Sequence, residues 1–194
     1  MKGFNRKNQL FSLCGLNCGL CPMQIGGYCP GCGGGAGNQS CKIAGCSLEH
    51  SGIEYCFDCI EYPCEKYASL DSYDSFITHK RRRADAEKAK KIGIEAYNRE
   101  QKEKAGILNT LLCGYNDGRK KSFYCTAVNL LELSELREAL EYITKSTRSC
   151  ELSVKEKSAF AANVLRSIAD KRNIELKLNK KNNSMFIREG RIWG

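Results

Sequence analysis

Histidine and proline are scarce in this chain of 194 residues. The two histidines, His50 and His79, lie in no metalloprotease or nucleophile motif, so the sequence indicates no histidine-based catalytic group and establishes no enzymatic activity. All three prolines precede residue 64, and the rest of the chain is rich in Lys, Glu, Leu and Ala, which is typical of helices. No apolar run reaches the roughly 20 residues of a membrane-spanning helix, so we expect no membrane partner.

Cysteine, in contrast, is abundant and concentrated in one segment. Ten of the 13 cysteines fall between residues 14 and 64. Charge changes near the end of that segment, because residues 1–78 carry five Lys and Arg against seven Asp and Glu, whereas residues 79–194 carry 26 against 15. We therefore predict a Cys-rich metal-binding module over residues 11–68, a linker over residues 69–83 and a basic, mainly helical domain over residues 84–194.

The spacing of these cysteines indicates metal binding. Three pairs are separated by two residues, and such a tight turn can direct both sulfurs at one ion, as tetrahedral zinc requires. The segment Cys29-Pro30-Gly31-Cys32-Gly33 has the knuckle pattern of zinc ribbons and rubredoxins, in which Gly33 permits a positive φ. The candidate metal ligands are Cys14, Cys18, Cys21, Cys29, Cys32, Cys41, Cys46, Cys56, Cys59 and Cys64.

The residues alone leave the division of these ligands open. Ten sulfurs allow two four-thiolate sites with two spare thiols, or one such site and a cluster, and His50 could replace one sulfur. We predict two structural zinc ions as the cofactor, because a small glycine-rich segment needs metal to offset its ordering entropy. An iron–sulfur cluster is the alternative, since Cys21-Pro22 and Cys29-Pro30 are similar to the Cys-Pro endings of ferredoxin motifs.

Four segments also carry a family resemblance. They are Cys14-Gly15-Leu16-Asn17-Cys18-Gly19-Leu20-Cys21-Pro22, Cys29-Pro30-Gly31-Cys32, Cys41-Lys42-Ile43-Ala44-Gly45-Cys46 and Tyr55-Cys56-Phe57-Asp58-Cys59-Ile60-Glu61-Tyr62-Pro63-Cys64-Glu65-Lys66. In this order they resemble a prokaryotic family of cysteine-rich, zinc-binding proteins catalogued as a domain of unknown function. A later segment, residues 115–125, resembles the longer members. The resemblance implies metal binding through the quoted cysteines and implies no activity. The Cys21–Cys29 interval is shorter than in many members, and the Cys32–Cys41 interval is rich in glycine.

The second half reads as helices followed by a hairpin. Apolar spacing predicts a helix over residues 84–112, which crosses solvent or breaks at the polar residues 98–104. Shorter helices are expected over residues 123–131, over residues 136–145 with Ser134 as cap, and from the capping box Ser153-x-x-Glu156 to about residue 173. Ile174, Leu176 and Leu178 alternate before a turn at residues 180–183, and Met185 and Ile187 follow. The fold class predicted is α+β, a zinc-ribbon or knuckle module before a basic helical domain with a C-terminal β-hairpin.

The basic half has two interpretations. It could dock on the module, which zinc-bound thiolates would make acidic, or it could contact nucleic acid or another polyanion. The second interpretation uses two clusters, the latter followed by Phe123 and Tyr124, which could stack on bases. These clusters are Arg81, Arg82, Arg83, Lys88, Lys90 and Lys91, and then Arg119, Lys120 and Lys121. Of the remaining cysteines, Cys113, Cys125 and Cys150 are expected in the core, although the second cluster could lower the pKa of Cys125 and make it reactive.

Together these features predict a metal-binding protein with a binding or scaffold role. An iron–sulfur protein for electron transfer and an enzyme with its site at the junction of the halves are the alternatives. The basic N-terminus with Leu10-Phe11-Ser12-Leu13 imitates an export signal, but its apolar run is short and lacks a cleavage site. We therefore expect a cytoplasmic location, where clustered cysteines bind metal more often than they form disulfides.

Overall fold

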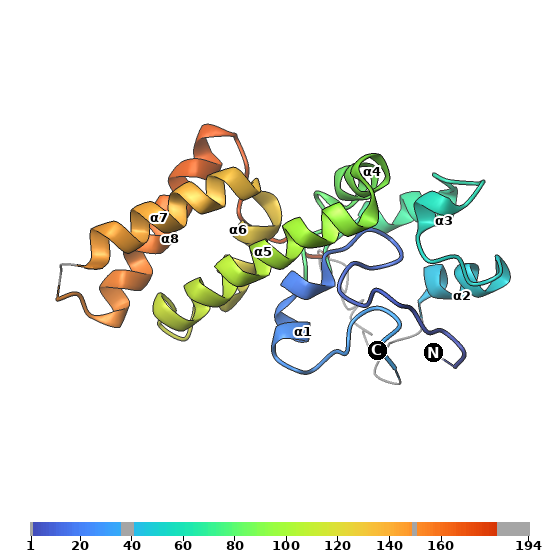
Figure 1. Cartoon of the computed structure of the whole chain (residues 1–194), viewed down its shortest axis with the longest axis horizontal. Coiled ribbons are helices and arrows are strands. Elements are labelled where there is room, and N and C mark those ends of the chain that lie inside the picture. Colours follow the sequence, from blue (N-terminus) through green and yellow to red (C-terminus); the bar gives the residue numbers. More distant parts are fainter. Residues whose placement is uncertain (1, 36–40, 149–150, 182–194) are drawn as a thin grey trace, which may run out of the picture.

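The computed structural model describes residues 2–35, 41–148 and 151–181 (Figure 1). Within those residues every regular element is a helix, and no strand or sheet is present. The predicted α+β class is therefore wrong, and the fold is helical. The zinc-ribbon form of the module is wrong for the same reason, because a ribbon is built on hairpin strands.

Short helices and turns build the cysteine-rich half. They are η1 (Cys18–Leu20), α1 (Pro22–Ile25), α2 (Lys42–Glu49), η2 (Cys56–Asp58), α3 (Glu65–Ala68) and η3 (Ser69–Asp71). Two of the closely spaced cysteine pairs close 3-10 turns in place of hairpins: the N–H of Cys21 donates to the Cys18 carbonyl at 3.0 Å, and that of Cys59 to the Cys56 carbonyl at 3.1 Å. The close spacing thus produces the expected tight turns without strands.

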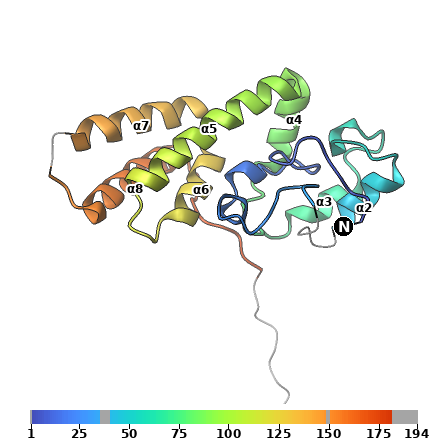
Figure 2. The same cartoon turned by 60° about the horizontal axis from the view of Figure 1, so that its bottom comes forward.

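Longer helices build the basic half and reach back to the module. They are α4 (Arg82–Ile92), α5 (Ile94–Gly114), α6 (Lys121–Leu130), α7 (Leu133–Arg148) and α8 (Val154–Lys171). Figures 1 and 2 show α5 running between the two halves, with α7 and α8 beside its C-terminal part and α1 near its middle. The main core lies among α5, α6, α7 and α8 and includes Leu108, Val128, Ile143 and Leu165, each at most 1% exposed.

The predicted helices are confirmed, with two differences. The break in the first helix falls at Gly93, whose φ of 85° ends α4 and begins α5. Residues 98–104 stay helical because their polar groups find partners: Lys104 is 3% exposed and donates to the Leu131 carbonyl at 2.7 Å. Ser153 caps α8 in a capping box with Glu156, as predicted. Ser134 is not a cap, because α7 already begins at Leu133.

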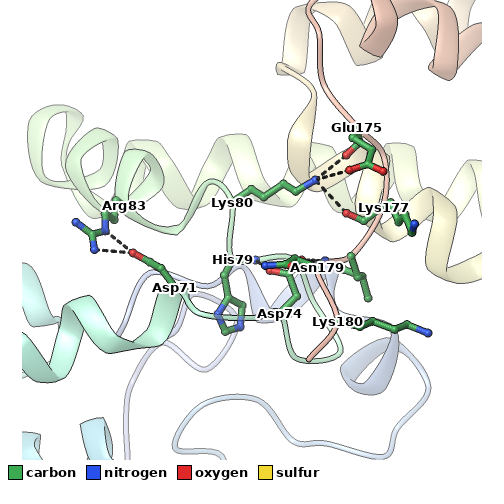
Figure 3. A pocket seen from close by; sticks show the side chains of 10 residues that line it. Asp71, Asp74, His79, Lys80, Arg83, Glu175, Lys177, Asn179 and Lys180 are labelled. Carbon is green, nitrogen blue, oxygen red and sulfur yellow. Dashed lines mark hydrogen bonds and ion pairs between the residues drawn. The ribbon is translucent and has the colours of Figure 1, made fainter. Parts of the chain in front are cut away.

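The tail after α8 is extended but pairs with no second strand in the described residues. Ile174 and Leu176 are half-buried against the helical core. On its other side, Lys80 donates to the carbonyls of Glu175 at 2.9 Å and Lys177 at 3.1 Å (Figure 3). The apolar alternation therefore reflects packing on helices, which corrects the predicted first strand. Met185 and Ile187, assigned to the return strand, lie outside the described residues.

Candidate metal centre

The ten clustered cysteines line two cavities. One, of about 350 Å³, is lined by six of them: Cys14, Cys18, Cys21, Cys29, Cys32 and Cys41. The other, of about 20 Å³, is lined by the remaining four: Cys46, Cys56, Cys59 and Cys64. We call these the six-cysteine set and the four-cysteine set. Each set contains at least one pair of cysteines separated by two residues, which is the spacing from which metal binding was predicted.

The six-cysteine set is held by tight turns in which glycine is required. The N–H of Cys32 donates to the Gln9 carbonyl at 2.9 Å, and Gly31, with φ 93°, approaches that carbonyl so closely that a Cβ would lie 2.5 Å from its oxygen. Gly33 has φ 80°, which confirms the expected positive φ after the second cysteine of the knuckle. This knuckle is therefore fixed against the N-terminal segment.

The four-cysteine set gathers residues from three short elements. Cys46 lies in α2, Cys56 begins η2, Cys59 follows that helix directly, and Cys64 immediately precedes α3. The N–H of Cys56 donates to the Leu13 carbonyl at 2.8 Å, which brings this set beside Cys14 of the other. The two sets are thus neighbours.

His50 does not line the four-cysteine cavity. Its Nδ1 lies 2.8 Å from the Cys46 carbonyl oxygen and 3.7 Å from the Cys46 sulfur. The nearer partner is the backbone carbonyl oxygen, which can only accept, so Nδ1 donates to it and the imidazole ring lies against the C-terminal end of α2. The suggestion that His50 replaces a cysteine sulfur gains no support from this placement.

The thiols perturb one another electrostatically. Burial raises the pKa of Cys18 well above its usual range, and the neighbouring Cys32 and Cys14 thiols raise it further. Burial likewise raises the pKa of Cys56, with Cys14 and Cys64 adding to the effect. Crowded buried thiols resist ionisation until a cation binds among them, and a metal ion supplies that cation and releases the protons.

Arg82 places a permanent positive charge against both sets. Its side chain is fully buried at the start of α4, and its guanidinium carbon lies 3.9 Å from the centre of the Tyr67 ring. It donates to the carbonyls of Tyr67 at 3.0 Å and Cys14 at 3.4 Å, and it pairs with the Asp71 carboxylate. Its charge lowers the pKa of both Cys14 and Cys56, against the dominant effect of burial.

Asn17 connects the six-cysteine set to the helical half. It is 4% exposed, donates to the Asp85 carboxylate at 2.9 Å and accepts from the Tyr97 hydroxyl at 3.0 Å. Asp85 in turn pairs with Arg81. Asn17 lies between Cys14 and Cys18, so this buried network fixes the loop that carries both thiols against α4 and α5.

The described residues contain no group of three or more His, Cys, Asp and Glu side chains that could hold a metal ion as they are placed. The cysteine sets therefore share cavities without forming a closed ligand shell. Sequence reasoning also missed Arg82 and Asn17. Arg82 was grouped with its neighbours as a surface cation, although its position on the buried side of α4, one turn before Ala86 and two before Ala89, was a usable signal.

The basic clusters lose several of their members to internal contacts. Arg82 is buried, Arg81 pairs with Glu132 at 2.5 Å, and Lys88 pairs with Glu100 at 2.6 Å. After the second cluster, Tyr124 is 0% exposed, so it cannot stack on a base.

The three remaining cysteines differ from one another. Cys125 is buried as predicted, and burial raises its pKa to about 12, which opposes the reactivity suggested by its basic neighbours. Cys113 is exposed, so its predicted place in the core is wrong; it lies on the outer face of α5 near its end. Cys150 lies outside the described residues.

A third cavity, of about 550 Å³, lies between residues 71–83 and the tail (Figure 3). Its three carboxylates are engaged by the chain itself. Asp71 pairs with Arg82 and Arg83, Asp74 accepts from the N–H groups of His79 and Asn179, each at 2.7 Å, and Glu175 lies 4.0 Å from Lys80. These contacts join the tail to the segment before α4 and leave no carboxylate of this cavity without a partner in the described residues.

Comparison with protein-family models, curated proteins and solved structures found no match. In the described part of the chain, no helix is both long and apolar enough to cross a membrane.

Proposed function

We propose that the cysteine-rich half binds two zinc ions on thiolates, one in each set, and that the protein has a binding or scaffold role in which the metal is structural. The observation that supports this proposal is the division of ten cysteines between two neighbouring cavities. The four-cysteine set has the number of thiols that one tetrahedral shell needs, and the six-cysteine set has enough for a second, with two thiols to spare. The family resemblance in the quoted cysteine segments points the same way.

The donor chemistry fits zinc. Thiolates are soft ligands that zinc accepts in sets of four, and the 20 Å³ of the four-cysteine cavity suits a single ion. To bind one ion, the sulfurs must lie closer together than they do in the structure. Rotation about χ1 can bring them closer, because it moves a cysteine sulfur while the backbone stays in place. Bound zinc would supply folding free energy, on the order of 10–16 kcal/mol in zinc-finger peptides, to a half made of short helices.

Elemental analysis of the chain purified without oxygen tests this proposal. We expect close to two zinc atoms per chain, little iron, no visible absorbance and four sulfur ligands per zinc by X-ray absorption spectroscopy. Stoichiometric iron with acid-labile sulfide and a brown colour would refute zinc. Three sulfurs and one exchangeable oxygen would instead indicate an open, catalytic zinc.

An iron–sulfur cluster is the second candidate, and the size of the six-cysteine cavity favours it. About 350 Å³ is more than one ion needs, and four of six thiolates would complete a cluster. A role in electron transfer would follow from it. An enzymatic site at the junction of the halves has weaker support, namely that cavities lie there.

Contact with nucleic acid or another polyanion is a further, weaker proposal. Among the described residues, Lys90, Lys91 and Arg119 are exposed cations of the two basic clusters for which the structure gives no ion pair. Phosphate contacts would make the affinity fall steeply with salt. A titration with single- and double-stranded oligonucleotides that shows no binding at low salt would dismiss the proposal. Cysteines without disulfides also suit a reducing compartment, so we propose a cytoplasmic location.

A further inference from the structure

One side of the six-cysteine cavity is formed by the irregular segment between η3 and α4. Ser75, Phe76 and Ile77 line this cavity together with the six cysteines. Ile77 is 5% exposed, so its side chain is packed inward, whereas Phe76 is 63% exposed and lies at the surface. None of the three residues lines the four-cysteine cavity. Residues 72–79, which we call the wall segment, thus lie between solvent and one cysteine set only.

The wall segment is closed on itself but is not hydrogen-bonded to the cysteines. The Asp74 carboxylate accepts from the N–H of His79 at 2.7 Å, and Nδ1 of His79 donates to the Leu70 carbonyl at 2.8 Å. No hydrogen bond in the described part of the chain joins the wall segment to any of the ten cysteines. A segment with few bonds to the structure beneath it opens locally at a low free-energy cost. Its position therefore depends on contacts made elsewhere.

The tail after α8 provides those contacts (Figure 3). The N–H of Asp74 donates to the Asn179 carbonyl at 2.7 Å, and the N–H of Asn179 donates to the Asp74 carboxylate, also at 2.7 Å. Directly after the wall segment, Lys80 donates to two carbonyls of the tail, at 2.9 and 3.1 Å. Ile174 and Leu176 of the same tail pack on the helical core. The tail thus connects the wall segment to the basic half.

We propose that the tail is a strap that keeps the six-cysteine cavity closed. When its bonds to Asp74 and Lys80 break, the wall segment moves outward, and metal ions and small reagents reach the thiols behind it. The four-cysteine cavity stays as it is, because no residue of the wall segment lines it. The two sets therefore differ in how fast they exchange with solution. The opening concerns the thiols with or without metal, and only its consequence for zinc exchange rests on the proposed function.

A short pulse of N-ethylmaleimide on the purified full-length chain, with alkylation read at each cysteine by peptide mass spectrometry, tests the strap. Lys80→Met combined with Asn179→Pro removes the donors of both contacts. This double variant should react about tenfold faster than the wild type at the six-cysteine set and at an unchanged rate at the four-cysteine set. Lys177→Met is the matched control, because its exposed side chain has no ion pair in the described residues and its carbonyl stays in place.

Phe76→Ala tests the wall segment while the strap stays intact. Because Phe76 is exposed, its truncation should leave the fold unchanged, but it shortens a side chain that lines the six-cysteine cavity. Alkylation of that set alone should therefore become faster. Tyr142→Ala is its control, since Tyr142 is an aromatic residue of similar exposure, 57%, that lines neither cavity, and neither set should change its rate.

Three results would overturn the proposal. Wild-type rates at the six-cysteine set of the double variant would show that the tail does not keep the wall segment in place. Equal acceleration at both sets would indicate a general loss of stability in place of the opening of one cavity. An unchanged rate in Phe76→Ala would show that the wall segment does not cover the thiols. Because alkylation needs no bound metal, a chain without zinc would refute the metal proposal and leave this comparison valid.

Discussion

Replacing Gly15 by alanine should destabilise the chain by about 3 kcal/mol. Gly15 follows the first cysteine of the six-cysteine set and has φ 90°, which a residue with a Cβ rarely adopts. A Cβ there would lie 2.6 Å from the backbone carbonyl oxygen of Arg82 and 3.2 Å from the Ala86 Cβ, so α4 would have to move away. Because the same loop carries Asn17, the displacement would also strain its bonds to Asp85 and Tyr97.

Urea unfolding followed by far-UV circular dichroism measures this loss. Gly106→Ala is the matched control, because Gly106 lies inside α5 and nothing stands within 4 Å of its added Cβ. That control should stabilise the chain by up to about 1 kcal/mol, the difference in helix propensity. Equal urea midpoints for Gly15→Ala and the wild type would show that the loop at Gly15 does not pack closely on α4.

Arg82→Met should lower the free energy of unfolding by a similar amount, about 3 kcal/mol, and should also weaken zinc binding about tenfold. The substitution keeps much of the side-chain volume but removes the charge over the Tyr67 ring and the bonds to the Cys14 and Tyr67 carbonyls. Four thiolates on Zn²⁺ leave a charge of −2, and Arg82 is the buried cation that lies against both cysteine sets. Competition with a colorimetric zinc chelator measures the affinity, and urea unfolding the stability.

Arg83→Met is the control for the neighbouring position. Arg83 pairs with the same Asp71 carboxylate at 2.6 Å, but its side chain is 53% exposed, so its removal should change stability by less than about 1 kcal/mol and leave zinc affinity unchanged. If the two variants behaved alike, the burial of Arg82 would not matter for stability or zinc affinity, and the electrostatic link between α4 and the cysteine sets would be wrong.

Local signals in the sequence predicted the local structure well. The capping box at Ser153 and the positive φ at Gly33 depend on neighbours within a few residues, and both are confirmed. The helices of the basic half follow from apolar stripes that need no knowledge of their partners. The alternating apolar residues of the tail led to the wrong prediction of a strand. A strand in a sheet and an extended segment packed on helices bury the same alternate side chains, here Ile174 and Leu176.

The arrangement of the candidate site depended on contacts between distant residues. Three consecutive arginines, Arg81 to Arg83, look alike in the sequence, and only the phase of α4 turns the middle one toward Tyr67. The two cysteine sets are neighbours because of the bond between the Cys56 N–H and the Leu13 carbonyl, which joins segments 43 residues apart. Spacing identified which cysteines gather, but such a long-range contact could not be derived from it.

Zinc content of set-specific variants, measured by native mass spectrometry, tests the central claim most directly. Cys59→Ser leaves three thiols in the four-cysteine set, the triple substitution of Cys18, Cys29 and Cys32 by Ser leaves three thiols in the six-cysteine set, and Cys113→Ser changes an exposed thiol outside both. We predict two zinc ions for the wild type and for Cys113→Ser, and one for each of the other two variants. A wild-type chain that carries no metal when purified without oxygen, or a Cys59 variant and a triple variant that both keep two ions, would contradict metal binding by two separate cysteine sets.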